Sequence, residues 1–160
     1  MADCPRITDL SAIGPVNFKL RNTGFLDDTE IEYDGYGSYQ ATRRNIWSTR
    51  NHNLRRVLRE FPLDEPLPDQ CAHWMHAVVG RHFFPDANHR TAFFMLRRIL
   101  SENGVEPGEW PTEKIEDVTR ESHRVRGEME QITMDIIYRK DELFEVWRRF
   151  FEDVLPEEDC

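Results

Sequence analysis

The sequence His82-Phe83-Phe84-Pro85-Asp86-Ala87-Asn88-His89-Arg90-Thr91-Ala92 decides how this chain is organised. Pro85 interrupts helical structure, whereas Asn88 can cap the strongly apolar segment that follows it. We expect that helix to run to about residue 103, with Gly104 at its exit. Upstream, the apolar residues between Asp69 and about Arg81 share one helical stripe, at Cys71, Trp74, Met75, Val78 and Val79. The stretch therefore predicts a loop between two helices, in a helix-loop-helix unit over residues 69–104.

The segments on either side of this unit also favour helices. Apolar residues recur at three-to-four spacing over 40–61, Thr112 can cap a further helix that Gly127 interrupts, and residues 129–155 suit one or two final helices. Residues 1–40 hold few apolar repeats and several turn residues, which predicts loops and at most one small N-terminal hairpin. No segment alternates at period two for long. The class that we expect is all-α, a helical bundle with its loop between two central helices.

Length, cysteine usage and charge limit the classes of protein to consider. The 160 residues fit one domain spanning 1–160, and three distant cysteines favour a reduced, cytoplasmic protein over a disulfide framework. The sequence holds no long apolar run and no basic leader, so we expect neither membrane insertion nor secretion. The net charge of −9 predicts no direct nucleic-acid partner for the protein as a whole. A local basic segment with Arg43, Arg44, Arg50, Arg55, Arg56 and Arg59 suits an acidic partner, a nucleotide or simply a solvated face.

The central loop combines the side chains that phosphate chemistry needs. The start of the following helix and the guanidinium of Arg90 attract an anion. Asp86 offers a hard oxygen ligand of the kind that holds Mg²⁺ through phosphate oxygens. An imidazole such as His82 titrates near neutrality and can accept a proton from an attacking hydroxyl. The loop therefore brings together a base, a metal ligand and an anion site.

Simpler interpretations exist for each of these residues. Asp86 and Asn88 are also ordinary turn and N-cap residues, and Arg90 can pair with a neighbouring carboxylate. Among the other candidate ligands, His73 and His76 with Cys71 would suit zinc, but no fourth ligand is evident in the sequence.

The loop resembles the signature of the Fic and Doc superfamily, His-x-Phe-x-Asp/Glu-Gly/Ala-Asn-x-Arg, at His82, Phe84, Asp86, Ala87, Asn88 and Arg90. The resemblance implies a Fic-like helical bundle. It makes His82 the catalytic base and Asp86 the Mg²⁺ ligand, and it makes Phe84 an inward anchor of the loop. It also implies that Asn88 and Arg90, with Ala87 and His89 beside them, contact the phosphates of ATP or another nucleoside triphosphate.

Two departures from the adenylylating pattern bear on the group transferred. His89 replaces its Gly, and Phe93 replaces its second Arg. A bulky residue at 89 is expected to obstruct the approach of phosphates to the loop backbone. The run from Asp86 to Ala92 resembles the Doc branch except at His89. The resemblance therefore favours a Doc-like toxin that phosphorylates a hydroxyl of a target protein, with adenylyl transfer or non-catalytic binding of a nucleotide or peptide as alternatives.

The regulator of such a protein is also suggested by the sequence. Thr112-x-x-x-Glu116-Asp117 comes close to the self-inhibitory motif of the family, but its last residue differs, and a helix start explains it better. The resemblance then implies a separate antitoxin-like partner.

Overall fold

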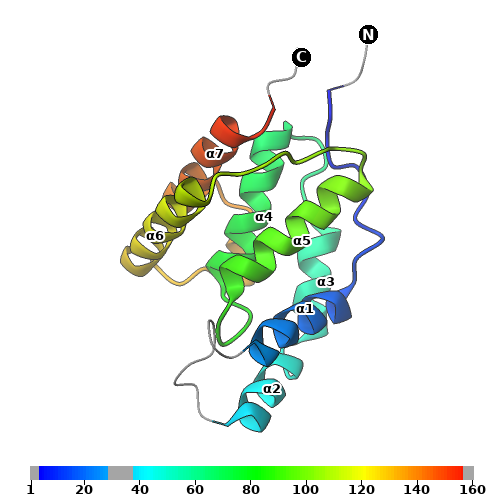
Figure 1. Ribbon diagram of the computed structural model, residues 1–160, viewed down its shortest axis with the longest axis vertical. Coiled ribbons are helices and arrows are strands. Elements are labelled where there is room, and N and C mark those ends of the chain that lie inside the picture. Colours follow the sequence, from blue (N-terminus) through cyan, green and yellow to red (C-terminus); the bar gives the residue numbers. More distant parts are fainter. Residues whose placement is uncertain (1–3, 29–37, 157–160) are drawn as a thin grey trace.

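The computed structural model describes residues 4–28 and 38–156. These residues contain seven α-helices and one short 3-10 turn (Figure 1). No strand occurs in these two ranges, so the expected all-α class is confirmed. The turn residues Asp34-Gly35-Tyr36-Gly37, at which the expected N-terminal hairpin could form, lie outside these ranges. The helices are α1 (Pro15–Asp27), α2 (Tyr39–Trp47), α3 (Asn51–Arg59), α4 (Leu67–Arg81), α5 (Asn88–Glu102), α6 (Thr112–Glu128) and α7 (Glu142–Val154), with the turn η1 (Met134–Ile136) before α7.

Helix α4 is the central element of the bundle. Twelve of its fifteen residues are buried, and it packs against α5 and α7 (Figure 1). The Trp74 ring is fully buried, stacks on Phe18 of α1 at 5.5 Å between centroids, and donates its indole N–H to the carbonyl of Ala92. These contacts tie α1, α4 and α5 together, and they position the α4–α5 loop between the three helices.

The prediction of loops over residues 1–40 is wrong for α1. Gly14 and Asn17 form a reciprocal cap, and Pro15 occupies the first turn, where its missing N–H costs nothing. The buried face of α1 includes Lys19, Asn22 and Thr23 beside its apolar residues. Because polar residues occupy buried positions, the apolar periodicity that normally marks a helix is absent from the sequence.

The single helix expected over residues 40–61 is divided into α2 and α3. Two hydroxyl bonds, one local and one long-range, lie at its break, residues 48–50. The Ser48 hydroxyl donates to the carbonyl of Asn45, and the Thr49 hydroxyl donates to the carbonyl of Phe83 in the α4–α5 loop. A local bond such as that of Ser48 competes with the helical ladder. The bond from Thr49 also attaches the α2–α3 corner to the loop.

The two described cysteines differ in state. Cys71 is buried and free, whereas Cys4 is disulfide-bonded, so the expectation of reduced cysteines is wrong for Cys4. None of the described helices combines the length and the apolar character needed to cross a bilayer.

Candidate active site

The α4–α5 loop begins and ends on residues in the left-handed backbone conformation. His82 has φ 56° and ψ 61° at the end of α4, and Ala87 has φ 58° and ψ 27° just before α5. No other non-glycine residue in the described ranges has positive φ. Each such residue costs on the order of 1–3 kcal/mol and persists only when its surroundings hold it. Side-chain bonds from Asn88 and Asn22 supply that support.

The Asn88 side chain braces the loop from inside. It is 4% exposed, and its Oδ1 accepts the N–H of Phe84 at 3.1 Å while its Nδ2 donates to the Phe84 carbonyl at 2.9 Å. The same Nδ2 lies 3.2 Å from Nδ1 of His82. Phe84 is itself buried as the expected inward anchor. The geometry therefore gives Asn88 a positioning role that the sequence did not suggest.

Asn22 of α1 holds the loop from the other side. Its Nδ2 donates to the backbone carbonyl of Asp86 at 3.0 Å and to the hydroxyl of Thr91 at 2.9 Å, and both Asn22 and Thr91 are fully buried. Sequence reasoning missed this residue, since it lies on a helix that the periodicity does not reveal.

His82 places its imidazole at the surface, between a donor and an acceptor. The residue is exposed, although its surroundings partly bury the ring. This partial burial lowers the pKa of His82, as do the charges of Arg126 and His123, whereas a hydrogen bond with the Pro85 carbonyl raises it. The ring is neutral at pH 7. A neutral imidazole keeps a lone pair on one of its two nitrogens, and that nitrogen can accept an incoming proton.

Asp86 provides one carboxylate at the tip of the loop. The side chain is half-buried, and its Oδ1 accepts the N–H of Ala87 at 2.8 Å. No group of three or more His, Cys, Asp or Glu side chains in the described ranges could enclose a metal ion, and this includes His73, His76 and Cys71. A single carboxylate does suit Mg²⁺, which commonly takes one or two carboxylates and completes its shell with phosphate oxygens and water.

His89 turns toward α6. Its Nε2 lies 2.9 Å from the hydroxyl of Ser122, and its ring centroid lies 4.4 Å from that of His123. Burial, with the nearby charges of His123 and Arg126, lowers the pKa of His89 to about 3. The ring is thus a neutral packing element between helices, and the obstruction expected from a bulky residue at this position does not follow from its placement.

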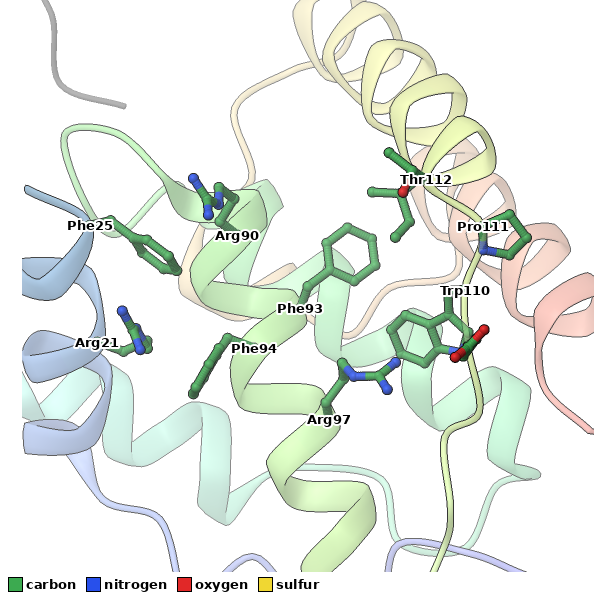
Figure 2. Close-up of a pocket in the computed structure, with 11 residues that line it drawn as sticks. Arg21, Phe25, Arg90, Phe93, Phe94, Arg97, Trp110, Pro111 and Thr112 are labelled. Atoms are coloured by element: carbon green, nitrogen blue, oxygen red, sulfur yellow. The ribbon is translucent and has the colours of Figure 1, made fainter. Parts of the chain in front are cut away.

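A wide groove of about 1010 Å³ runs beside the start of α5 (Figure 2). Its wall combines guanidinium groups with aromatic rings. Arg21 lies 4.4 Å from the ring centroids of both Phe25 and Phe94, and Arg97 lies 4.7 Å from that of Trp110. Arg90 is exposed, lies 4.7 Å from the Phe25 ring, and is the one signature residue that lines the groove.

The remaining signature residues, His82 and Asp86 among them, do not line the groove. They belong to the loop that precedes α5. Phe93 does line it, and its ring packs against Trp110 and Trp147 at 5.8 and 5.4 Å. The candidate site thus has two parts, a loop with the imidazole and carboxylate and an adjoining cationic, aromatic groove, which meet at Arg90.

Comparison with models of known protein families, with curated proteins and with solved structures finds no match for this chain.

Proposed function

We propose that this chain is a Doc-like toxin that transfers a phosphoryl group from a nucleoside triphosphate, such as ATP, to a hydroxyl of a target protein. The observation that carries the proposal is the neutral, exposed imidazole of His82 on a loop that two buried amides hold in place. That loop leads directly into the amino end of α5. The resemblance of the loop to the Fic and Doc signature supplies the reaction class.

The proposed reaction needs one proton acceptor. The hydroxyl oxygen of the target attacks the γ-phosphorus, the bond from that phosphorus to the β,γ-bridging oxygen breaks, and a nucleoside diphosphate leaves. The hydroxyl proton passes to the unprotonated nitrogen of His82. General-base catalysis of this kind contributes about 10²- to 10⁴-fold to the rate. The lowered pKa of His82 supports this role, since the ring is in its basic form at pH 7.

Charge neutralisation in this proposal falls to Asp86, Arg90 and the first turn of α5. Asp86 would hold Mg²⁺, which when bound neutralises the phosphate oxygens. The first N–H groups of a helix have no partner within it, and they attract phosphate. Arg90 adds a permanent charge where the loop meets the groove. The volume of the groove, about 1010 Å³, is sufficient for a nucleoside triphosphate.

Phosphoryl transfer is favoured over adenylyl transfer by the side chain at position 93. A second cation at that position would bind the terminal phosphate and hold it as part of the leaving group. Phe93 packs among aromatic rings instead, and in this respect the chain resembles the Doc branch. Adenylyl transfer of the Fic type is the alternative within the same reaction class.

A separate antitoxin-like protein is the regulator that we propose, acting in the cytoplasm, where nucleoside triphosphates are abundant. Thr112 begins α6 and lines the groove, so the segment that came close to a self-inhibitory motif serves as a helix start. An inhibitor would then come from a second chain that covers the loop and Arg90.

A non-catalytic binding module is the rival from another class. Each polar atom of the Asn88 amide already has a partner in the loop, and Phe93 removes a cation. Such a site could bind a nucleotide or a peptide and transfer nothing.

Two labelled forms of ATP separate these functions. The purified chain is incubated with cell extract, Mg²⁺ and ATP labelled at either the α- or the γ-phosphate, beside the matched variant His82→Asn. Protein labelled from the γ position alone supports the kinase, and label from the α position supports adenylyl transfer. Nucleotide binding by calorimetry without labelled protein in either reaction favours the binding module.

A further inference from the structure

The positive charge of this acidic protein is concentrated on α2 and α3. From Tyr39 to Arg59 the sequence holds six arginines and neither Asp nor Glu, in a chain whose net charge is −9. Arg56 and Arg59 pair with Glu60, at 2.7 and 3.9 Å. Within the described part of the chain, four exposed arginines of this segment make no ion pair: Arg43, Arg44, Arg50 and Arg55. On α6 and α7, by contrast, Arg120, Arg124 and Arg148 all pair with carboxylates.

A hollow on this basic face contains an aromatic ring. It has a volume of about 430 Å³ and is lined by Gln40, Arg43, Arg44, Trp47 and Ser48. The indole of Trp47 is fixed, because its N–H donates to the hydroxyl of Thr23 at 2.9 Å. The Arg43 guanidinium lies 5.5 Å from the ring centroid. A fixed aromatic ring with guanidinium groups beside it can stack a base while its flanking phosphates meet the cations.

The basic face adjoins the candidate active loop. Thr49, at the corner between α2 and α3, donates its hydroxyl to the carbonyl of Phe83 at 3.0 Å, and Arg50 is the next residue. A strand that follows the arginines from α2 to α3 would therefore pass close to His82 without occupying the groove at Arg90, on whose wall none of these arginines lies.

We propose that α2 and α3 form a docking surface for single-stranded nucleic acid, with one base in the Trp47 hollow and the backbone along Arg44, Arg50 and Arg55. The net charge of −9 argues against nucleic acid only if it is averaged over the molecule. Electrostatic repulsion from distant carboxylates is screened beyond about 8 Å at physiological salt. A flexible single strand can stay on the basic face, whereas a stiff duplex would extend over acidic surface. The Trp47 hollow favours a base-bearing polyanion over an acidic protein, which has no base to stack.

Fluorescence anisotropy with a labelled RNA 12-mer of mixed sequence tests this surface. At 50 mM salt we expect a Kd between about 1 and 100 µM, as for non-specific nucleic-acid binding. Each neutralised phosphate of a single strand contributes about −0.7 to the slope of log K against log salt, so the three arginines along the backbone predict a slope of about −2. A mononucleotide should bind much more weakly than the 12-mer.

The two matched pairs of charge variants change only exposed arginines. Arg44→Gln with Arg55→Gln should weaken binding about tenfold or more and reduce the slope by about 1.4. Arg98→Gln with Arg149→Gln removes the same charge from exposed positions on α5 and α7 and should leave binding within about twofold. Trp47→Leu should weaken binding about tenfold through lost stacking.

Three results would overturn the proposal: no binding of the 12-mer, equal effects of the two charge pairs, or equal affinity for polyglutamate, which would assign the face to an acidic protein. The proposed binding of RNA does not involve His82. The RNA-binding proposal can therefore fail while the proposed phosphoryl transfer stands, and the phosphoryl-transfer proposal can fail while RNA binding stands.

Discussion

The substitution Asn88→Ala tests whether Asn88 positions the loop or only contacts phosphate. In the structure the Asn88 amide makes both of its bonds to Phe84 and contacts the ring of His82. The substitution leaves the N–H and the carbonyl of Phe84 in buried surroundings without these partners. It also releases the constraint on the left-handed conformations of His82 and Ala87. If Asn88 only bound a ligand, its substitution would not destabilise the loop of the free protein.

The expected loss of stability follows from these contacts. A buried polar group left without a partner costs about 1–3 kcal/mol. Two such groups, partly relieved by relaxation of the loop, predict a loss of about 2–4 kcal/mol. For a domain of this size each kcal/mol lowers Tm by about 2–4 °C, so Asn88→Ala should lower Tm by about 4–16 °C.

Calorimetry without nucleotide measures this change, beside Asn45→Ala as a control at an exposed position of α2. Asn88→Ala could also open the loop without unfolding the domain. In that case the Phe84 amide would lose its protection from hydrogen exchange, while Tm would fall by less than the expected amount. If both Tm and the exchange rate of Phe84 match those of the Asn45→Ala control, the positioning role of Asn88 is refuted.

Four other perturbations address the same site. His82→Asn keeps a residue type that tolerates positive φ, and it should abolish γ-labelling with Tm nearly unchanged. Because the pKa of His82 is lowered from 6.5, wild-type activity should rise with pH below about 6.5 and level off above. An inflection above pH 7 would contradict the assignment of His82 as the base. Asp86→Ala should remove both transfer and its dependence on Mg²⁺, whereas activity that persists in EDTA would exclude the metal role. Asn22→Ala, which deletes two buried bonds to the loop and α5, should cost about 1–3 kcal/mol in urea unfolding and slow transfer. The pKa of His89 falls to about 3 on folding, so the unfolded chain binds the extra proton between about pH 6.5 and 3 and stability should decrease as pH falls through that range; His89→Gln should show a smaller decrease between pH 7 and 5.

The helices around the loop were predictable because local signals and tertiary packing agree there. The apolar stripe of α4 faces the core, and α5 and α6 begin close to the expected positions. The predicted capping roles are wrong, because Asn88 and Thr112 are the first helical residues, the N-caps are Ala87 and Pro111, and neither end has a side-chain cap. Helix α1 was not predictable, because its buried positions include Asn22 and Lys19, whose roles are set by distant partners. Asn22 bonds to the loop, and Lys19 donates to the carbonyl of Trp47 at 3.0 Å. A side chain buried for a bond across the fold leaves no periodic signal in its own segment.

The residues of the loop were predictable as a set, but their individual roles were not. Both turn chemistry and phosphate binding use Asn, and the sequence alone cannot show to which partner its amide donates. The same holds for His89, where the sequence predicted a bulky obstacle at the loop and the structure shows a ring held by Ser122. The role of each residue depends on the side of the backbone that it faces. This orientation depends on how α1 and α6 pack against the loop.

This division between inward and outward residues also bears on the choice between an enzyme and a binding module. Phe84, Ala87 and Asn88 are buried, and any chain that keeps this loop conformation needs residues of their kind. His82 and Arg90, by contrast, are exposed. The left-handed backbone at residue 82 would be held at lower cost by Gly or Asn. A histidine is therefore not the residue that this backbone conformation favours, and the proposed proton transfer would account for its presence there.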